Sequence, residues 1–306
     1  MALHRLASIT IGVPNVGETC LYYAEFGLGR EGASFSTGGG GEQLRIVESA
    51  TRRLIELCVA ADDPDDLDRV ANGLVRLGIT IQRDPSSISA VEDHSGARVV
   101  VKLLPRISPV PATIGRYNDE GRNERKNQRA PGVLREDPIR PRKLGHVVVG
   151  TPDAEASRRF FVEGVGFKVS DQVRDVAAFL RCSTDHHNLL FQPAPVAFLH
   201  HTSWQVDDVD EVGRGAMRML EGHPERHIWG LGRHFIGSNF FWYLRDPAGN
   251  FSEYYSDMDT ITDDQLWIPG TWEPSLRTLY AWGPDVPPSM LQPEDLADLM
   301  AASHQG

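Results

Sequence analysis

The sequence predicts an α+β protein in which one structural unit is duplicated along the chain. LASITIGVPNVGETCLYYAEFGLG, from Leu6, aligns without a gap with LGHVVVGTPDAEASRRFFVEGVGF, from Leu144. LIELCVAADDPDDLDRVANGL, from Leu54, aligns in the same way with LHHTSWQVDDVDEVGRGAMRM, from Leu199. Repeats spaced in this way indicate two domains of similar construction.

The first pair of segments predicts a strand followed by a helix. Apolar residues alternate as far as Gly12-Val13-Pro14 in one copy and Gly150-Thr151-Pro152 in the other, which is typical of a strand that ends in a turn. Apolar residues at helical spacing follow, and a glycine ends each run.

The second pair predicts another strand and another helix. The helix follows Asp62 and Asp63 in the first copy, and Asp207 and Asp208 in the second, because acidic groups favour the N-terminal end of a helix dipole. A turn then leads into a final strand in EDHSGARVVVKLL and in RDPAGNFSEYY. Each half therefore contains two strand–helix–strand units with added hairpin strands.

The domain organisation follows from these repeats. We expect an N-terminal domain, a charged linker, a C-terminal domain that carries the functional site, and a tail that packs near that site, over residues 1–105, 106–140, 141–260 and 261–306. From Arg116 to Lys143 there are nine Lys or Arg and five Asp or Glu, with one aromatic residue, which favours a solvated linker over a nucleic-acid arm.

The tail after Met258 carries Trp267, Trp272 and Trp282, so we expect it to cover an apolar surface. A short helix is expected from Gln292 to Ala302.

Composition excludes several classes of function. With 306 residues and 41% hydrophobic content the chain can form a large core, while its net charge of -11 disfavours nucleic acids and anionic membranes as partners. We expect a cytoplasmic protein, because no stretch approaches the roughly 18 to 20 apolar residues of a membrane span and no signal peptide is evident. Cys20, Cys58 and Cys182 form no CxxC pair and are expected to be buried.

A complete set of possible metal ligands occurs only in the second copy of the repeat. Eight of the eleven histidines lie between His146 and His234. At three aligned positions the second copy has two histidines and a glutamate, whereas the first copy has a serine, a glutamate and a valine. The pairs are His146 with Ser8, His201 with Glu56 and Glu253 with Val100.

Each of these three residues lies in a short alternating run, so each is expected on a strand with its side chain on one face. Three strands of one sheet can direct two imidazoles and a carboxylate to one point. This arrangement holds non-haem Fe(II) and leaves positions open for substrate and dioxygen. Zn(II), Mn(II), Ni(II) and Co(II) accept the same ligand types.

Other residues nearby could move protons, namely His187, His234 and Tyr243. The remaining histidines of this region are interpreted as ordinary hydrogen-bonded residues. These are His186, His200, His223 and His227.

The segment GRHFIGSNFFWYLRDPAGNFSEYY combines a His, a Tyr, an acidic-Pro-x-Gly turn and a Glu in a fixed order. In this the chain resembles the two-domain type I extradiol ring-cleaving dioxygenases of the vicinal oxygen chelate superfamily, which include catechol 2,3-dioxygenases and 2,3-dihydroxybiphenyl 1,2-dioxygenases. The resemblance covers nearly the whole chain and is strongest from Leu144 to Asp259.

The resemblance implies tandem βαβββ modules, two in each domain, with each domain a partly closed barrel. It implies an N-terminal domain without metal. It also implies Fe(II), with Mn(II) as the alternative, a substituted catechol and O2 as substrates, a muconic semialdehyde type of product, and a homo-oligomer. The implied ligands are His146, His201 and Glu253, and the implied catalytic groups are His187, His234 and Tyr243.

Two alternatives remain at this stage: a metal-dependent isomerase or transferase similar to glyoxalase, and a non-catalytic small-molecule binding protein. The substrate also remains open. Aromatic residues could line an apolar mouth for a bicyclic catechol, namely Trp229, Phe235, Phe240 and Phe241. Arg233 or Arg181 could instead pair with a substrate carboxylate.

Overall fold

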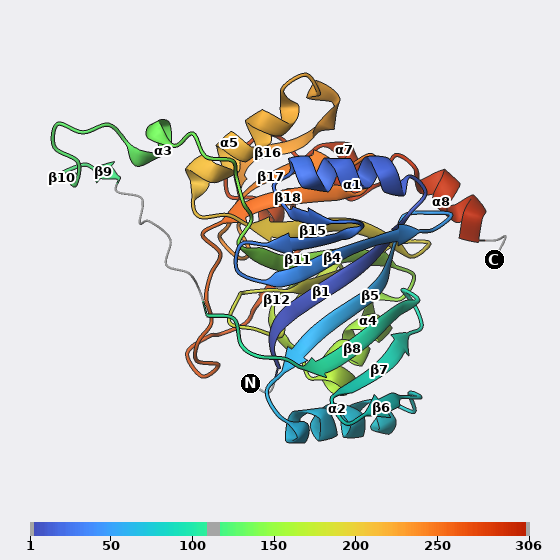
Figure 1. Cartoon of the computed structure of the whole chain (residues 1–306). Helices are drawn as coiled ribbons and strands as arrows, with labels where there is room; N and C mark the ends of the chain where they lie inside the picture. The colour runs from blue at the N-terminus through green and yellow to red at the C-terminus, as the bar shows by residue number, and fades with distance from the viewer. Residues whose placement is uncertain (1–2, 109–116, 304–306) are drawn as a thin grey trace.

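The computed structural model describes residues 3–108 and 117–303 and contains two large β-sheets, one from each half of the chain (Figure 1). The N-terminal sheet has eight strands in the order β2-β3-β4-β1-β5-β8-β7-β6. The elements of this half are β1 (Leu3–Val13), α1 (Val16–Glu25), β2 (Gly29–Glu31), β3 (Ser34–Thr37), β4 (Gly41–Glu48), β5 (Arg53–Ala61), α2 (Pro64–Arg76), β6 (Gln82–Asp84), β7 (Ser87–Glu92) and β8 (Ala97–Leu103).

The C-terminal sheet has nine strands in the order β16-β17-β18-β15-β11-β14-β13-β12-β19. Its main elements are β11 (Lys143–Thr151), α4 (Ala154–Arg159), the π-helical turn η1 (Phe160–Val165), β12 (Lys168–Val173), β13 (Ala177–Arg181), β14 (Leu189–Pro193), β15 (Phe198–Gln205), α5 (Val209–Leu220), the 3₁₀ turn η2 (Pro224–Arg226), β16 (His227–Arg233), β17 (Phe240–Arg245) and β18 (Phe251–Ser256). Both halves thus contain two βαβββ modules, which confirms the predicted α+β fold.

The strand register shows how closely the two halves match. Cys58 pairs with both Ser8 and Val100 in the N-terminal sheet. Ser203 pairs with His146 and with Glu253 in the C-terminal sheet, at the aligned positions. The strands that carry His146, His201 and Glu253 are three consecutive strands of their sheet, in the order β18-β15-β11.

Two successive aspartates precede a helix in each half, and the second of the two caps that helix. Asp63 caps α2 and Asp208 caps α5, each accepting from a backbone N–H of the first helical turn. The aspartate before each of these caps forms an ion pair with an arginine. Asp62 pairs with Arg106, and Asp207 pairs with Arg142.

Helix α1 of the N-terminal half packs against β18 of the C-terminal half. The ring of Phe26 stacks on Tyr254, with centroids 3.8 Å apart, and the Tyr22 hydroxyl lies 2.5 Å from the Ser252 hydroxyl. Because neighbouring strand residues point to opposite faces, this contact places Glu253, between Ser252 and Tyr254, on the face away from α1. The domain interface thereby supports the strand that carries the predicted carboxylate ligand.

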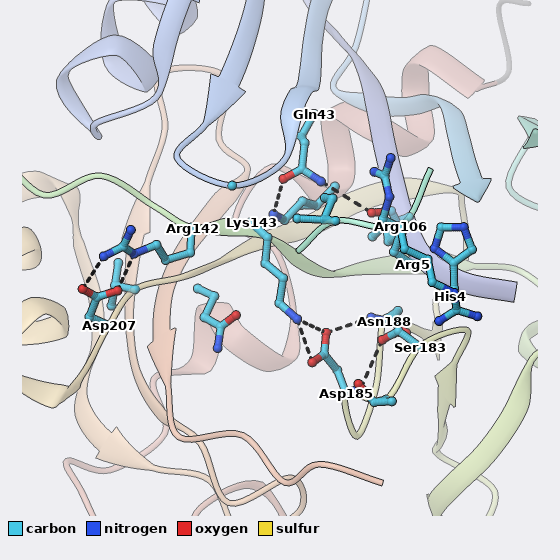
Figure 2. Close-up of a pocket in the computed structure, with 17 residues that line it drawn as sticks. His4, Arg5, Gln43, Arg106, Arg142, Lys143, Ser183, Asp185, Asn188 and Asp207 are labelled. Atoms are coloured by element: carbon cyan, nitrogen blue, oxygen red, sulfur yellow. Dashed lines mark hydrogen bonds and ion pairs between the residues drawn. The ribbon is translucent and has the colours of Figure 1, made fainter. Parts of the chain in front are cut away.

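A cleft of about 450 Å³ lies between the start of β1 and the start of β11 (Figure 2). Several of the residues that line it form ion pairs. Lys143 binds Asp185 at 2.6 Å, beside the pair formed by Arg142. Gln43 crosses the cleft, since its amide nitrogen donates to the Ala7 carbonyl and its amide oxygen accepts from the N–H of Leu144.

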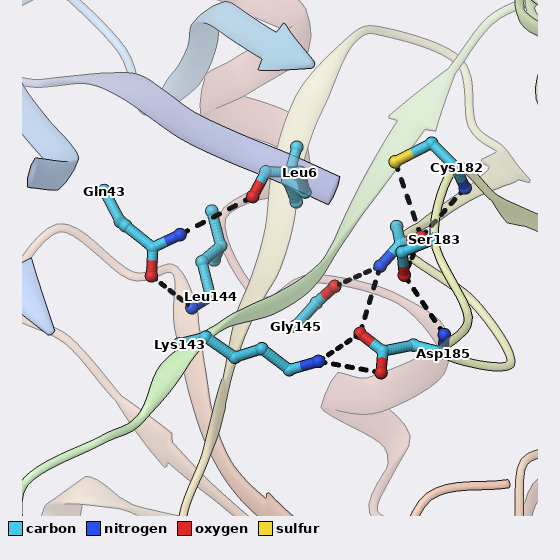
Figure 3. A network of polar contacts seen from close by, with 9 residues as sticks. Leu6, Gln43, Lys143, Leu144, Gly145, Cys182, Ser183 and Asp185 are labelled. Carbon is cyan, nitrogen blue, oxygen red and sulfur yellow. Dashed lines mark hydrogen bonds and ion pairs between the residues drawn. The ribbon is translucent and has the colours of Figure 1, made fainter. Parts of the chain in front are cut away.

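Asn188, which lines this cleft, joins the backbone of β11 to the segment around Cys182, and Figure 3 shows Gly145 and Cys182 in this network. Its amide nitrogen donates to the Gly145 carbonyl at 3.0 Å, and its amide oxygen accepts from the Cys182 N–H at 2.9 Å. The backbone of Gly145, the residue before His146, is therefore held by the Asn188 side chain. Among the described residues, Cys20, Cys58 and Cys182 are all free and buried, as predicted.

The linker and the tail are built from short elements. These are β9 (Asn118–Asp119), β10 (Arg122–Asn123), α3 (Pro131–Leu134), β19 (Gly270–Trp272), α6 (Leu276–Leu279), α7 (Pro288–Leu291) and α8 (Leu296–Ser303). The linker hairpin β9–β10 extends away from both sheets in Figure 1, and residues 109–116 of the predicted linker lie outside the described residues.

The tail differs from expectation in two respects. β19 pairs with β12 and so extends the C-terminal sheet, and the N–H of Gly270 also donates to the carboxylate of Asp171. The last helix begins at Leu296 and not at Gln292, because a turn precedes it in which the Leu296 N–H donates to the Pro293 carbonyl. In the described part of the chain, no helix has the length and apolar character that a membrane crossing requires.

Candidate metal centre and active site

His146, His201 and Glu253 meet inside the C-terminal sheet. One donor atom from each lies within 4.8 Å of the others. Nε2 of His146 is 3.1 Å from Oε2 of Glu253 and 3.3 Å from Nε2 of His201, and the latter is 3.9 Å from the same carboxylate oxygen. All three side chains are buried, and Glu253 is 0% exposed.

The electrostatics of this cluster fit a divalent cation. Burial alone would raise the pKa of Glu253, but the imidazoles of His146 and His234 favour its charged form and lower the pKa below its ordinary value. Burial lowers the pKa of His201 well below its ordinary value, which favours the neutral ring that binds metals. Glu253 Oε2 has no hydrogen-bond donor among the described residues, and a buried carboxylate oxygen in this situation calls for a cation.

Tyr243 and His234 lie beside this cluster. Tyr243 is directly opposite Glu253 in the β17–β18 ladder, and its hydroxyl is 3.0 Å from Nε2 of His234. Nδ1 of His234 is 2.6 Å from the Leu279 carbonyl, to which it must donate because a carbonyl only accepts. When the ring carries only that hydrogen, Nε2 of His234 is the acceptor for the Tyr243 hydroxyl. Burial and nearby Glu253 raise the pKa of Tyr243 well above its usual value.

His187 lies on the other side of the cluster, with its ring centroid 4.3 Å from that of His146. Burial, followed by the neighbouring imidazoles, lowers the pKa of His187 well below its ordinary value. The structure therefore brings all six predicted site residues together.

Two histidines that were interpreted as ordinary also belong to this site. Nδ1 of His186 is 3.1 Å from Nδ1 of His187, and its Nε2 is 3.0 Å from the buried carboxylate of Asp171. Nδ1 of His200 is 2.7 Å from Nδ1 of His201. The doubled histidines His186-His187 and His200-His201 were the available signal in the sequence. By contrast, His223 is exposed, and His227 accepts from the Trp242 indole on the surface.

A cavity of about 450 Å³ opens onto the cluster. Its wall is mostly apolar, and no Lys, Arg, Asp or Glu is among the described residues that line it. Strands β11, β13 and β14 supply one side, and the tail supplies much of the other. The tail residues are Pro274, Ser275, Leu276, Thr278, Leu279, Val286, Met290 and Leu291.

The predicted substrate-binding residues are only partly present in this wall. Trp229 lines the cavity, whereas Phe241 is buried in the core and Phe235 packs against Trp272 of the tail. Neither proposed arginine reaches the cavity. Arg233 binds Asp257 at 2.8 Å, and Arg181 binds Asp264.

Comparison with known proteins agrees with this geometry. Residues 143–254 match the Glyoxalase/Bleomycin resistance protein/Dioxygenase superfamily. Metapyrocatechase 2 of Cupriavidus necator is 35% identical over 250 residues, which are 79% of this chain and 76% of that protein. An iron-dependent extradiol dioxygenase of Rhodococcus jostii is 31% identical over 41% of this chain and 46% of its own length.

Solved structures share the fold. BphC, a halotolerant catechol dioxygenase, superimposes with a TM-score of 0.74 at 21% identity, covering 94% of this chain and 98% of its own. The Mn(II)-bound glyoxalase of Novosphingobium aromaticivorans gives 0.72 at 23% identity, covering 96% and 99%. On the extent of its similarity to metapyrocatechase 2, the chain belongs to the extradiol ring-cleaving dioxygenases of the vicinal oxygen chelate superfamily.

Proposed function

We propose that the protein cleaves the ring of a catechol that carries an apolar substituent, using O2 and an Fe(II) ion held by His146, His201 and Glu253. The observation that carries this proposal is the buried convergence of these three side chains at the inner end of an apolar cavity. When bound, the metal would acidify a coordinated catechol hydroxyl and hold substrate and dioxygen side by side.

The protein's own groups would move the protons. Tyr243 is placed to pass a proton to Nε2 of His234, which the Leu279 carbonyl keeps as an acceptor. Across the cavity, His187 has its Nδ1 turned to His186, and the Asp171 carboxylate holds that second ring. We propose that His187 gives and takes the proton needed on the dioxygen side.

The cavity wall favours an apolar substituent over a charged one. A substrate carboxylate would lose water without meeting a permanently charged cation, since the wall formed by the described residues has histidines but no Lys or Arg. Relatives named biphenyl-2,3-diol 1,2-dioxygenases, such as that of Paraburkholderia xenovorans, 30% identical over 41% of this chain, accord with a bulky aryl group.

The N-terminal half is proposed to have a structural role. Ser8, Glu56 and Val100 occupy the three ligand positions there. Its helix α1 instead braces β18, which carries Glu253.

Oxygen-electrode measurements test the proposal. The metal-free protein is loaded anaerobically with Fe(II) or Mn(II) and given catechol, 3-methylcatechol, 3-phenylcatechol and a dihydroxybenzoate. One O2 consumed per catechol, with a yellow product and the highest kcat/KM for an apolar 3-substituent, is expected. No uptake by metal-loaded protein would refute the dioxygenase proposal and would favour isomerase or binding activity. A preference for the dihydroxybenzoate would refute only the substrate class.

A further inference from the structure

His200 lies at an irregular point of strand β15. The ladder with β11 pairs His201 with Val148 but Leu199 with Val149, so His200 is an extra residue in a β-bulge. Neighbouring strand residues ordinarily point to opposite faces, whereas the bulge turns both imidazoles toward the cavity wall. The N-terminal sheet has a register shift at the aligned place, where Ile55 stands. Both halves therefore have an irregularity at this place, but only the half with the ligand cluster has a histidine there.

The hydrogen bonds of His200 fix where its proton lies. Its Nε2 is 3.0 Å from the Met290 carbonyl, which only accepts, so Nε2 carries the hydrogen. A second hydrogen, on Nδ1, would place a positive charge on a ring that is 4% exposed, beside the Leu199 carbonyl to which the buried guanidinium of Arg52 already donates. Nδ1 of His200 is therefore an acceptor, and Nδ1 of His201, 2.7 Å away, is the donor.

The hydrogen on Nδ1 of His201 determines the protonation of its other ring nitrogen, Nε2. A neutral imidazole has one hydrogen, so a ring protonated on Nδ1 presents a lone pair on Nε2. Nε2 of His201 is the atom that faces His146 and Glu253. A ligating histidine whose other nitrogen is held by a partner binds metal more tightly, and loss of such a partner typically costs about 10- to 100-fold in affinity.

A second contact joins the tail to the same region of strand β15. Arg52 donates to both carboxylate oxygens of Asp295, at 2.7 and 2.8 Å, and a third N–H reaches the Leu199 carbonyl beside the bulge. One buried guanidinium thus joins the tail to the strand that carries both histidines.

We propose that His200 is a positioning residue for the metal site: anchored on the Met290 carbonyl of the tail, it accepts the Nδ1 hydrogen of His201 and so fixes the tautomer that turns Nε2 toward the metal. The proposal rests on the proposed function only in taking His201 as a metal ligand. It gives the C-terminal tail a part in metal binding as well as in forming the cavity.

Metal affinity gives the first test. Fe(II) is titrated anaerobically into the metal-free protein by calorimetry at neutral pH. His200→Phe keeps a ring but no acceptor, and we expect affinity to fall about 10- to 100-fold. His200→Asn places an oxygen near the position of Nδ1 and should stay within about threefold of wild type. The matched control is His227→Asn, which changes an exposed histidine of the same sheet and should leave affinity unchanged.

Thermal unfolding of each metal-free variant checks that it is folded, and His200→Leu replaces the Phe variant should that one unfold. No Fe(II) binding by wild type would refute the metal site itself. Normal wild-type binding with unchanged affinity in the folded Phe or Leu variant would refute the role of His200.

Histidine ¹⁵N–¹H correlation spectra of the metal-free protein give an independent readout that does not depend on the metal. We expect His201 protonated on Nδ1 and His200 on Nε2, with His201 losing its fixed tautomer in the His200→Phe variant. A His201 ring protonated on Nε2 in wild type would overturn the proposal.

Discussion

Tyr243 provides the sharpest test of how protons move in this site. The residue is 2% exposed, and its hydroxyl lies 3.0 Å from Nε2 of His234. Its ring contacts the rings of His201 and Trp229. Tyr243→Phe removes one oxygen and leaves the packing in place. The change therefore isolates the proton relay from the shape of the cavity.

The expected loss can be estimated from this one hydrogen bond. Leaving a buried polar group without its partner costs about 1–3 kcal/mol, and a positioned acid or base contributes about 10²–10⁴ in rate. Since about 1.4 kcal/mol is a factor of ten, the two ranges overlap near a 100-fold loss of kcat. Metal content should not change, because the hydroxyl is outside the set of converging donor atoms.

Stopped-flow absorbance of the ring-cleavage product with saturating catechol and O2 measures kcat, and atomic absorption measures the bound metal. Tyr117→Phe, on the 45% exposed tyrosine of the linker, is the control. A kcat within about threefold of wild type would refute the relay through His234. Loss of metal in the variant would instead show that Tyr243 acts on the ligands.

Three further predictions follow from the same contacts. Alanine in place of His146, His201 or Glu253 should abolish stoichiometric metal binding, and full iron content in all three variants would refute the ligand set. Phe26→Ala should lower the free energy of unfolding in urea by about 3–5 kcal/mol because it empties the stacked contact with Tyr254, whereas Leu21→Ala, at a 64% exposed position of α1, should change it by less than about 0.5 kcal/mol. A loss below about 1 kcal/mol for Phe26→Ala would contradict the packing argument. Burial raises the pKa of Cys58 to about 11, so alkylation of this thiol by iodoacetamide should rise about tenfold per pH unit from pH 7 to 10, as the thiolate fraction does, and a plateau near pH 9 would contradict this environment.

The catalytic partners could be found from the sequence but not placed by it. Tyr243 and Glu253 are separated by the Asp246-Pro247-Ala248-Gly249 turn, and side-chain alternation does not carry through a turn of unknown geometry. The structure makes them direct cross-strand neighbours. The same limit applies to His200, because a β-bulge shifts the register by one residue and leaves no mark in an alternating pattern.

The sequence by itself determined the duplicated strand–helix–strand architecture, because strand and helix periodicities are local and the repeat preserves them at Leu6 and Leu144, while the resemblance implied the βαβββ module. Comparison of the two copies also singled out His146, His201 and Glu253, since only one copy has them. The tertiary structure alone decided what surrounds them: a mostly apolar cavity without a Lys or Arg in its described wall, the tail carbonyls that hold His200 and His234, and the pairing of Arg233 with Asp257. These contacts join segments tens of residues apart, and their formation depends on packing that no local pattern encodes.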